Sequence, residues 1–167
     1  MEINVDVQGL SVVERKLRLL PDRLGNNAMR RALRKGANVI RNEARNNAKR
    51  IDDPETREQI WKNIAVYGGG RRRERRVGGV MMRVGVRGGA RFNPESASAP
   101  GGNTSGYWRL VEFGTSKMRA QPFMQPAAAN KAQAAADAIT KDMRVQVDRE
   151  IDKLNRQIVD LTRAAGG

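Results

Sequence analysis

The sequence of 167 residues contains neither cysteine nor histidine. The absence of cysteine excludes disulfides, thiolate metal sites and thiol nucleophiles. The absence of histidine excludes a Ser-His-Asp triad, an HExxH zinc site and an imidazole that transfers protons near neutral pH. Most hydrolase mechanisms lose their usual base. We therefore expect no enzyme, with no catalytic residue, no metal and no cofactor.

Aromatic residues are scarce as well, at 4% of the chain. An all-β sandwich normally draws on many aromatic and β-branched side chains, so the composition favours a helix-rich α+β fold. Hydrophobic residues make up 39%, which suffices for the core of one domain. We predict a single domain over residues 1–167, in which a small antiparallel sheet is packed by N-terminal helices and a long C-terminal helix.

Long hydrophobic runs are missing too. No apolar run approaches the roughly 20 residues that a membrane span requires. The first ten residues also lack the basic start and apolar centre of a signal peptide. We expect no membrane contact and a protein that is made and used in a cytoplasm.

Positive charge is what the chain has in excess. The 32 lysines and arginines outnumber the 18 acidic residues, which gives a formal net charge of +14. A molecule with this charge attracts polyanions at cellular ionic strength. The densest stretch holds eight arginines between Arg71 and Arg91, against the single acid Glu74.

Residues 1–53 predict a strand and two helices. Apolar residues alternate with polar ones in the strand at Ile3, Val5 and Val7. Helical spacing follows from residue 10 until Pro21 breaks it, and a long basic amphipathic helix then covers residues 22–49. Asp52, Asp53 and Glu55 cap a helix restart at Pro54 better than they bind a metal ion. The restarted helix is short and carries Ile60 and Trp61.

Residues 54–123 are predicted to be rich in β structure. Residues 64–67 and 77–86 form two strands, joined by a flexible basic loop at 68–76 that is too long for a tight hairpin turn. A second flexible loop covers 88–106, where Pro and Gly leave no periodicity. Residues 107–113 resume as a strand.

Residues 124–164 predict the terminal helix, whose Ala-rich pattern from Ala127 onward is roughly 55 Å long at ~1.5 Å per residue. Its apolar stripe steps by three or four residues through Ile139, Met143, Val147, Ile151, Leu154, Ile158 and Leu161. Acidic and basic residues nearly balance along it, which disfavours an anionic membrane surface. The stripe therefore indicates packing against another helix, within or between subunits.

The arginine-rich stretch has two interpretations. Its guanidinium groups can bind phosphate oxygens in forked pairs, or they can be solvated or paired with acids of a neighbouring subunit. The candidate residues for contact with DNA or a neighbouring ring are Arg71, Arg72, Arg73, Arg75, Arg76, Arg83 and Arg87. Neither glycine-rich segment nearby has the order of a phosphate-binding loop, so we expect no nucleotide site.

One segment resembles a known family. It reads Tyr107-Trp108-Arg109-Leu110-Val111-Glu112-Phe113-Gly114-Thr115-Ser116-Lys117, then Ala120-Gln121-Pro122-Phe123-Met124-Gln125-Pro126-Ala127. It is similar to the signature of the gene-10-like tail-component, or tail-completion, family of long-tailed bacteriophages of the HK97 and lambda type. The signature residues are Tyr107, Glu112, Phe113, Gly114, Thr115, Pro122, Phe123 and Pro126.

These residue types suggest structural roles. Gly114 permits a sharp exit from the strand, and Thr115 or Ser116 satisfies freed backbone groups. Pro122 and Pro126 stiffen the path into the terminal helix, and Phe123 fills the core between them. The sequence leaves the role of Glu112 open, and an arginine of its own subunit or of the next is one candidate partner.

The resemblance implies a structural virion protein in the phage neck, assembled in the host cytoplasm. It would join the tail tube to the head connector as a homo-oligomer, expected to be a hexameric ring. Its neighbours would be the connector or head-closure protein, the tail terminator, and the tail tube or tape measure, with the DNA end in the lumen. A tail terminator of the same neck and a stand-alone basic nucleic-acid-binding module are the alternatives.

Overall fold

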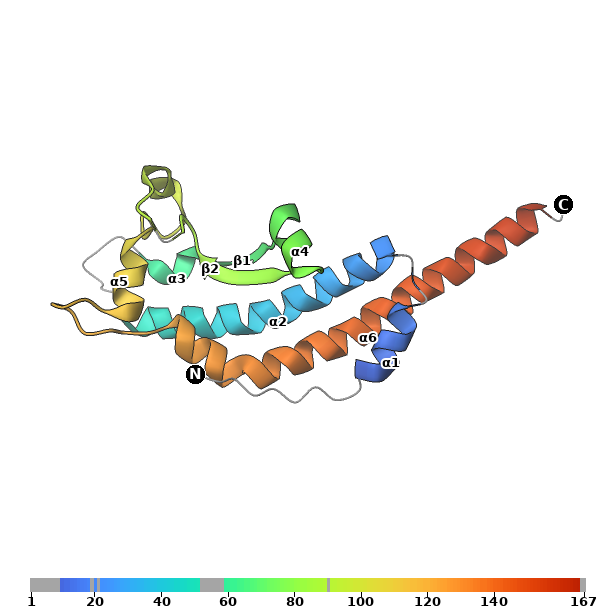
Figure 1. Ribbon diagram of the computed structural model, residues 1–167, viewed down its shortest axis with the longest axis horizontal. Helices are drawn as coiled ribbons and strands as arrows, with labels where there is room; N and C mark the ends of the chain where they lie inside the picture. The colour runs from blue at the N-terminus through green and yellow to red at the C-terminus, as the bar shows by residue number, and fades with distance from the viewer. Residues whose placement is uncertain (1–9, 19, 21, 52–58, 90, 166–167) are drawn as a thin grey trace.

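Two long antiparallel helices form the axis of the molecule (Figure 1), as seen in a computed structural model that describes residues 10–18, 20, 22–51, 59–89 and 91–165. These are α2 (Asp22–Ile51) and α6 (Met124–Ala165). The shorter elements are α1 (Leu10–Leu17), α3 (Ile60–Asn63), β1 (Ile64–Gly68), α4 (Arg71–Val77), β2 (Met82–Val86), the 3-10 helix η1 (Pro94–Ser98) and α5 (Tyr107–Phe113). This confirms the α+β class, with a small antiparallel sheet and a long C-terminal helix.

Small residues allow α2 and α6 to pack closely. On α2 they lie four or eight positions apart, with Ile40 at the intervening position, and all are buried: Ala28, Ala32, Gly36, Ala44 and Ala48. At Gly36 the two backbones are so close that a Cβ would lie 2.7 Å from the carbonyl oxygen of Ala135 and would also collide with Ile139. Residues four apart share one face of a helix, so this spacing gives α2 a single smooth face toward α6.

The core has two parts, one at each end of the helix pair. One part joins the sheet to both helices around Ile64, Val86 and Phe123. The other lies where α1 packs on α6, around Val13, Met143 and Val147, and Lys16 of α1 pairs with Asp148 at 2.6 Å. The two long helices thus support a β-hairpin at one end and α1 at the other.

The hairpin consists of β1 and β2, which pair antiparallel from Ile64 opposite Val86 to Gly68 opposite Met82. The first predicted strand is confirmed. The second is shorter than predicted, because it begins at Met82 rather than at residue 77. Since side chains alternate along a strand, Ile64 and Val86 face α2 while Tyr67 and Arg83 face outward.

Two predictions of local structure are wrong. The segment predicted as a flexible loop at 68–76 contains the helix α4, and the strand predicted at 107–113 is the helix α5. In α5 the buried residues Val111 and Glu112 follow the half-buried Trp108 at helical spacing, three and four positions later. A run in which almost every residue is apolar fits both periods, and packing against the core decides between them.

The segment at 88–106 has little regular structure, as predicted, apart from η1. It is nevertheless fixed to the end of α3 by Asn63, which is fully buried. The Asn63 side-chain amide donates to Gly102 O and Thr104 Oγ1, both at 2.8 Å, and its oxygen accepts from Gly101 N at 3.0 Å. A backbone hydrogen bond from Gln59 N to Gly101 O adds to this attachment.

Glu112 caps the start of α6. Its carboxylate accepts hydrogen bonds from the backbone amides of Phe123, Met124 and Gln125, at 2.8, 2.9 and 2.9 Å. Within its own chain Glu112 thus binds backbone amides: first-turn amides have no partner within their own helix, and the positive end of the helix dipole attracts the carboxylate. Pro126 lies in this first turn, where its missing N–H leaves no hydrogen bond unmade. Phe123 is fully buried, as predicted.

Three sequence predictions lie outside the described residues. They concern the strand at Ile3, Val5 and Val7, the helix break at Pro21, and the capping by Asp52, Asp53 and Glu55. Among the helices of the described part, none has the length and apolar character that a membrane crossing needs.

The contact at Gly36 predicts an unusual response to alanine. Alanine within a helix normally stabilises by up to about 1 kcal/mol relative to glycine. Gly36→Ala should instead destabilise by about 1–3 kcal/mol, because α2 and α6 must separate to admit the new methyl group. Gly25→Ala in the same helix is the matched control, since its Cβ would lie 3.8 Å from Leu17 Cδ2, an ordinary contact. Urea denaturation of both variants measures the difference, and equal stability would contradict the close packing.

The cap at the start of α6 predicts that Glu112→Gln destabilises the fold. Glutamine replaces one accepting oxygen by a donating NH2 group, which leaves a buried first-turn amide unpaired and costs about 1–3 kcal/mol. Asp152→Asn is the control. Asp152 is an exposed residue of α6, so this change should leave the unfolding free energy unchanged. Thermal unfolding followed by circular dichroism compares the two, and an unchanged Tm for Glu112→Gln would refute the cap.

Candidate functional site

Five arginines of the arginine-rich stretch lie in α4 at the tip of the β-hairpin. Gly70 and Gly78 flank the helix with φ of 76° and 72°, a backbone conformation that favours glycine. A hydrogen bond of 2.8 Å from Gly69 N to Met81 O extends the strand pairing up to the base of α4. The hairpin therefore holds a helical tip in place of a flexible loop.

Glu74, the single acid of α4, attaches this helix to α2. Its carboxylate accepts two hydrogen bonds from Arg30, at 2.7 Å from Nη1 and 3.1 Å from Nη2. The hydrogen bonds from Arg30 hold the pKa of Glu74 below its usual value, so the carboxylate stays ionised. The side chain is only 18% exposed. The pair therefore directs the acid inward and leaves the arginines of α4 outside.

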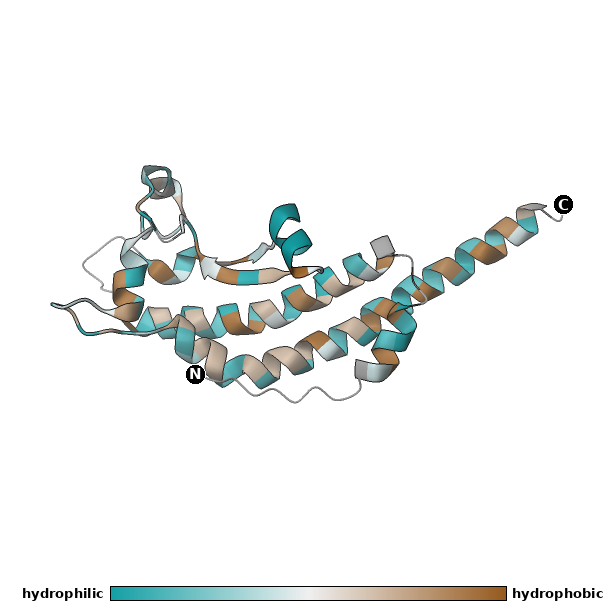
Figure 2. Cartoon of the chain, viewed as in Figure 1, coloured by the Kyte–Doolittle hydropathy of each residue, from teal (hydrophilic) through white to brown (hydrophobic). Residues whose placement is uncertain are grey.

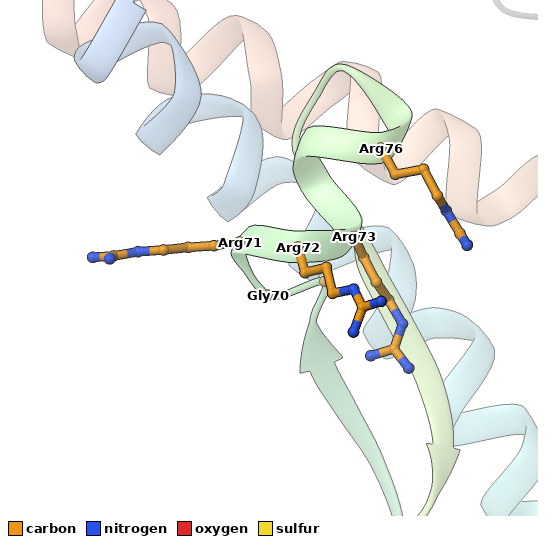
Figure 3. A pocket seen from close by; sticks show the side chains of 6 residues that line it. Gly70, Arg71, Arg72, Arg73 and Arg76 are labelled. Atoms are coloured by element: carbon orange, nitrogen blue, oxygen red, sulfur yellow. The ribbon is translucent and has the colours of Figure 1, made fainter.

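The five arginines of α4 point into solvent in more than one direction. Figure 3 shows Arg71 extending to one side, while Arg72, Arg73 and Arg76 lie on the other. The last three line a hollow of about 600 Å³ together with Gly69, Gly70 and Arg71. All five side chains are exposed, and within the described residues none of them has an acidic partner. Figure 2 shows α4 as hydrophilic along nearly its whole length.

The other two candidate arginines lie on the outer face of the hairpin. Arg83 is on β2 opposite Tyr67, and Arg87 follows the end of that strand on the same face. Burial raises the pKa of the Tyr67 hydroxyl, and the nearby charges of Arg87 and Arg83 oppose this shift. The structure thus places five arginines at the tip and two along the outer face of the same hairpin.

Arg45 on α2 adds another guanidinium group near Arg87. Arg45 donates two hydrogen bonds to the carbonyl oxygen of Ile64, at 3.0 and 2.7 Å. Burial lowers its pKa, and the charges of Arg41 and Arg87 lower it further. Sequence reasoning missed this arginine and Arg30 as parts of the site, because α2 carries so many basic residues that no spacing distinguishes these two.

The signature residues divide into a buried and an exposed group. Glu112 and Phe123 are buried and fix the start of α6. Gly114 has φ of 74°, and a Cβ there would lie 2.7 Å from Ala120 N. Thr115 Oγ1 accepts hydrogen bonds from Lys117 N and Met118 N, as the sequence predicts for freed backbone groups. These residues shape the passage from α5 to α6.

Tyr107 and Phe113 belong to the exposed group. Together with Leu110 they lie at spacing three on α5, and Phe113 is 56% exposed. On a strand, residues three apart lie on opposite faces, so these side chains form one stripe only because the segment is a helix. Exposed aromatic and aliphatic side chains on one face are typical of a protein contact.

The arrangement has the chemistry of an anion-binding surface. Arginine guanidinium groups present forked donors that match phosphate oxygens. The described part of the chain has no cluster of three or more acids that could hold a metal ion. What the hairpin provides is a concentrated, ordered positive surface.

Comparison with known proteins assigns the family. A family described as "Bacteriophage HK97-gp10, putative tail-component" matches residues 12–114, which is more than half of the chain and extends from α1 to the end of α5. No curated protein and no solved structure gives a significant match. The chain belongs to the HK97-gp10-like family of bacteriophages and is thus a structural component of a phage tail.

Proposed function

We propose that this protein completes the head-proximal end of the phage tail, where a ring of identical subunits joins the tail tube to the head connector. The five arginines of α4 then face the lumen and contact the end of the packaged DNA. The observation that carries this proposal is that the five arginines of α4 are held on an ordered helix and have no acidic partner in the described part of the chain. The family match and the net charge of +14 support it.

Charge is the first argument for a DNA contact. Repeating α4 around a ring would place many guanidinium groups close together, and their mutual repulsion needs a polyanion to offset it. A DNA end within the ring provides such a polyanion at every azimuth. Contact with phosphates also needs no base sequence, which suits a site that must accept the end of any packaged genome.

Order is the second argument. A flexible loop loses conformational entropy when it binds, whereas α4 is already fixed by Gly69, Gly70 and the Arg30–Glu74 pair. The arginines leave this helix in different directions (Figure 3), so one subunit can contact phosphates on both sides of its own position. The helical tip is therefore better suited to phosphate contact than the loop that the sequence predicts.

Exposed apolar surfaces support assembly into a larger structure. The stripe on α5 contains Tyr107, Leu110 and Phe113, and the free end of α6 exposes Ile158 and Leu161. These two surfaces lie at opposite ends of the elongated molecule (Figure 1). Exposed apolar patches on an otherwise basic protein fit contacts with other copies and with neighbouring neck proteins.

The test replaces the five α4 arginines by glutamine, which keeps the helix propensity close to that of arginine. The matched control removes the same charge from exposed residues outside the hairpin that have no ion pair with another described residue: Arg15, Lys35, Arg50, Lys141 and Arg149, each changed to glutamine. In a phage that lacks its own copy of the gene, we expect the α4 variant to lower the yield of infectious particles or the retention of DNA. The control should support near-normal yield.

Binding to duplex DNA in solution gives a second readout of the same variants. If all five arginines contact phosphates, the slope of log K against log salt concentration becomes shallower by about 4.5 in the α4 variant. The control should keep the original slope. Equal losses in both variants would show that only net charge matters, and unchanged particle yield with the α4 variant would exclude the proposed role.

A further inference from the structure

The last turns of α6 extend beyond the rest of the molecule. Residues 155–164, which we call the overhang, are exposed throughout and cover ~15 Å of helix. Within them Ile158 is 60% and Leu161 70% exposed, and Val159 is exposed beside them. Figure 1 shows this end of α6 clear of every other described element.

The overhang continues an apolar stripe that is used inside the chain. Ile151 and Leu154 pack partly against the core around α1, and Ile158 and Leu161 follow at steps of four and three residues. Figure 2 shows apolar residues recurring toward the free end of the helix. The stripe thus extends beyond the part of the core that covers it, which leaves a helical ridge without a partner in the described part of the chain.

An apolar groove lies elsewhere on the same molecule. It has a volume of about 500 Å³ and is lined by residues of α2, of β2 and of the first half of α6. The main lining residues are Leu33, Ala37, Ile40, Met82, Val84 and Ala128. These side chains are half-buried, so the groove can accept further apolar groups. Its concave, aliphatic lining suits the apolar ridge of an amphipathic helix.

The overhang cannot reach the groove of its own chain. Both features belong to α6, because Ile139 lines the groove and Leu161 lies on the overhang. Along a continuous helix these two residues are about 33 Å apart. A rigid helix holds them at that separation, so the overhang can enter this groove only on another molecule.

We propose that the overhang of one copy docks in the α2–β2–α6 groove of the next copy. The ridge of Ile158, Val159 and Leu161 supplies the apolar side chains, and the groove supplies a matching aliphatic lining. This inference rests on the proposed ring only for its biological setting, because the contact itself follows from the two surfaces.

The contact is heterologous, since different patches of the two copies meet. Heterologous contacts repeat from copy to copy and close into a ring when the rotation permits. Each subunit donates one overhang and accepts another. A single contact with three large side chains is smaller than a stable dimer interface, but closure of a ring makes the last contact intramolecular and strengthens the whole.

The natural absence of cysteine allows a clean cross-linking test. One variant carries Leu161→Cys on the overhang, and another carries Ala37→Cys in the groove. A short bismaleimide added to the concentrated mixture should join the two variants as a heterodimer. Arg149→Cys, exposed on α6 outside the overhang, replaces Leu161→Cys in the matched control and should give no product with Ala37→Cys.

A chain with both cysteines should give a ladder of covalent oligomers that ends at the number of subunits in the ring. A third set adds Ile158→Ser and Val159→Ser to the Leu161→Cys variant. This variant should fold normally, because the overhang lies outside the core. With the Ala37→Cys variant it should give little or no cross-linked heterodimer.

Three results would overturn the docking. Cross-linking of Leu161→Cys with itself alone would show that overhangs pair with each other. A heterodimer that forms only after deletion of residues 1–9 would show that this segment occupies the groove. No heterodimer at any concentration up to the solubility limit would exclude the contact. Each of these results leaves the α4 charge variants unaffected, so failure of the docking and failure of the proposed DNA contact are distinguishable.

Discussion

The close approach of α2 and α6 at Gly36 is the constraint on which the rest of the structure depends. Small buried residues along one face of α2 let the two helices pack with little space between their backbones. The β-hairpin then packs on α2 through Ile64 and Val86, and α1 packs at the other end of the pair. A side chain at Gly36 would separate α2 from α6 and would thereby also shift the β-hairpin and α1.

Both proposed contact surfaces follow from this helix pair. Arg30 of α2 holds Glu74, so the helix that forms the core also orients the arginines of α4. The α6 helix has 42 residues against 30 in α2, so part of it necessarily extends past its partner. The structure therefore combines a rigid interior with two exposed features at a distance from each other, an ordered basic tip and an apolar overhang.

The sequence predicted those elements in which one period was clear. The long helices and the strand that begins at Ile64 were correct because apolar spacing decides them, and the burial of Phe123 followed from its place between Pro122 and Pro126. Sequence-based prediction failed where the local composition fitted more than one structure. The run of charges at α4 was interpreted as a loop, and the mostly apolar run at α5 was interpreted as a strand. The role of Glu112 could not be predicted, since its partners are backbone amides eleven to thirteen residues later, which no side-chain pattern reveals.

We propose that this tail component forms a ring at the head-proximal end of the tail with α4 turned to the lumen. A reconstruction of the intact phage neck at side-chain resolution tests it most directly. We expect a ring of this chain between the head connector and the tail tube, with density for the DNA end beside Arg71 to Arg76. A position at the distal end of the tail, a ring that only caps the tube as a terminator, or α4 on the outer surface would contradict it.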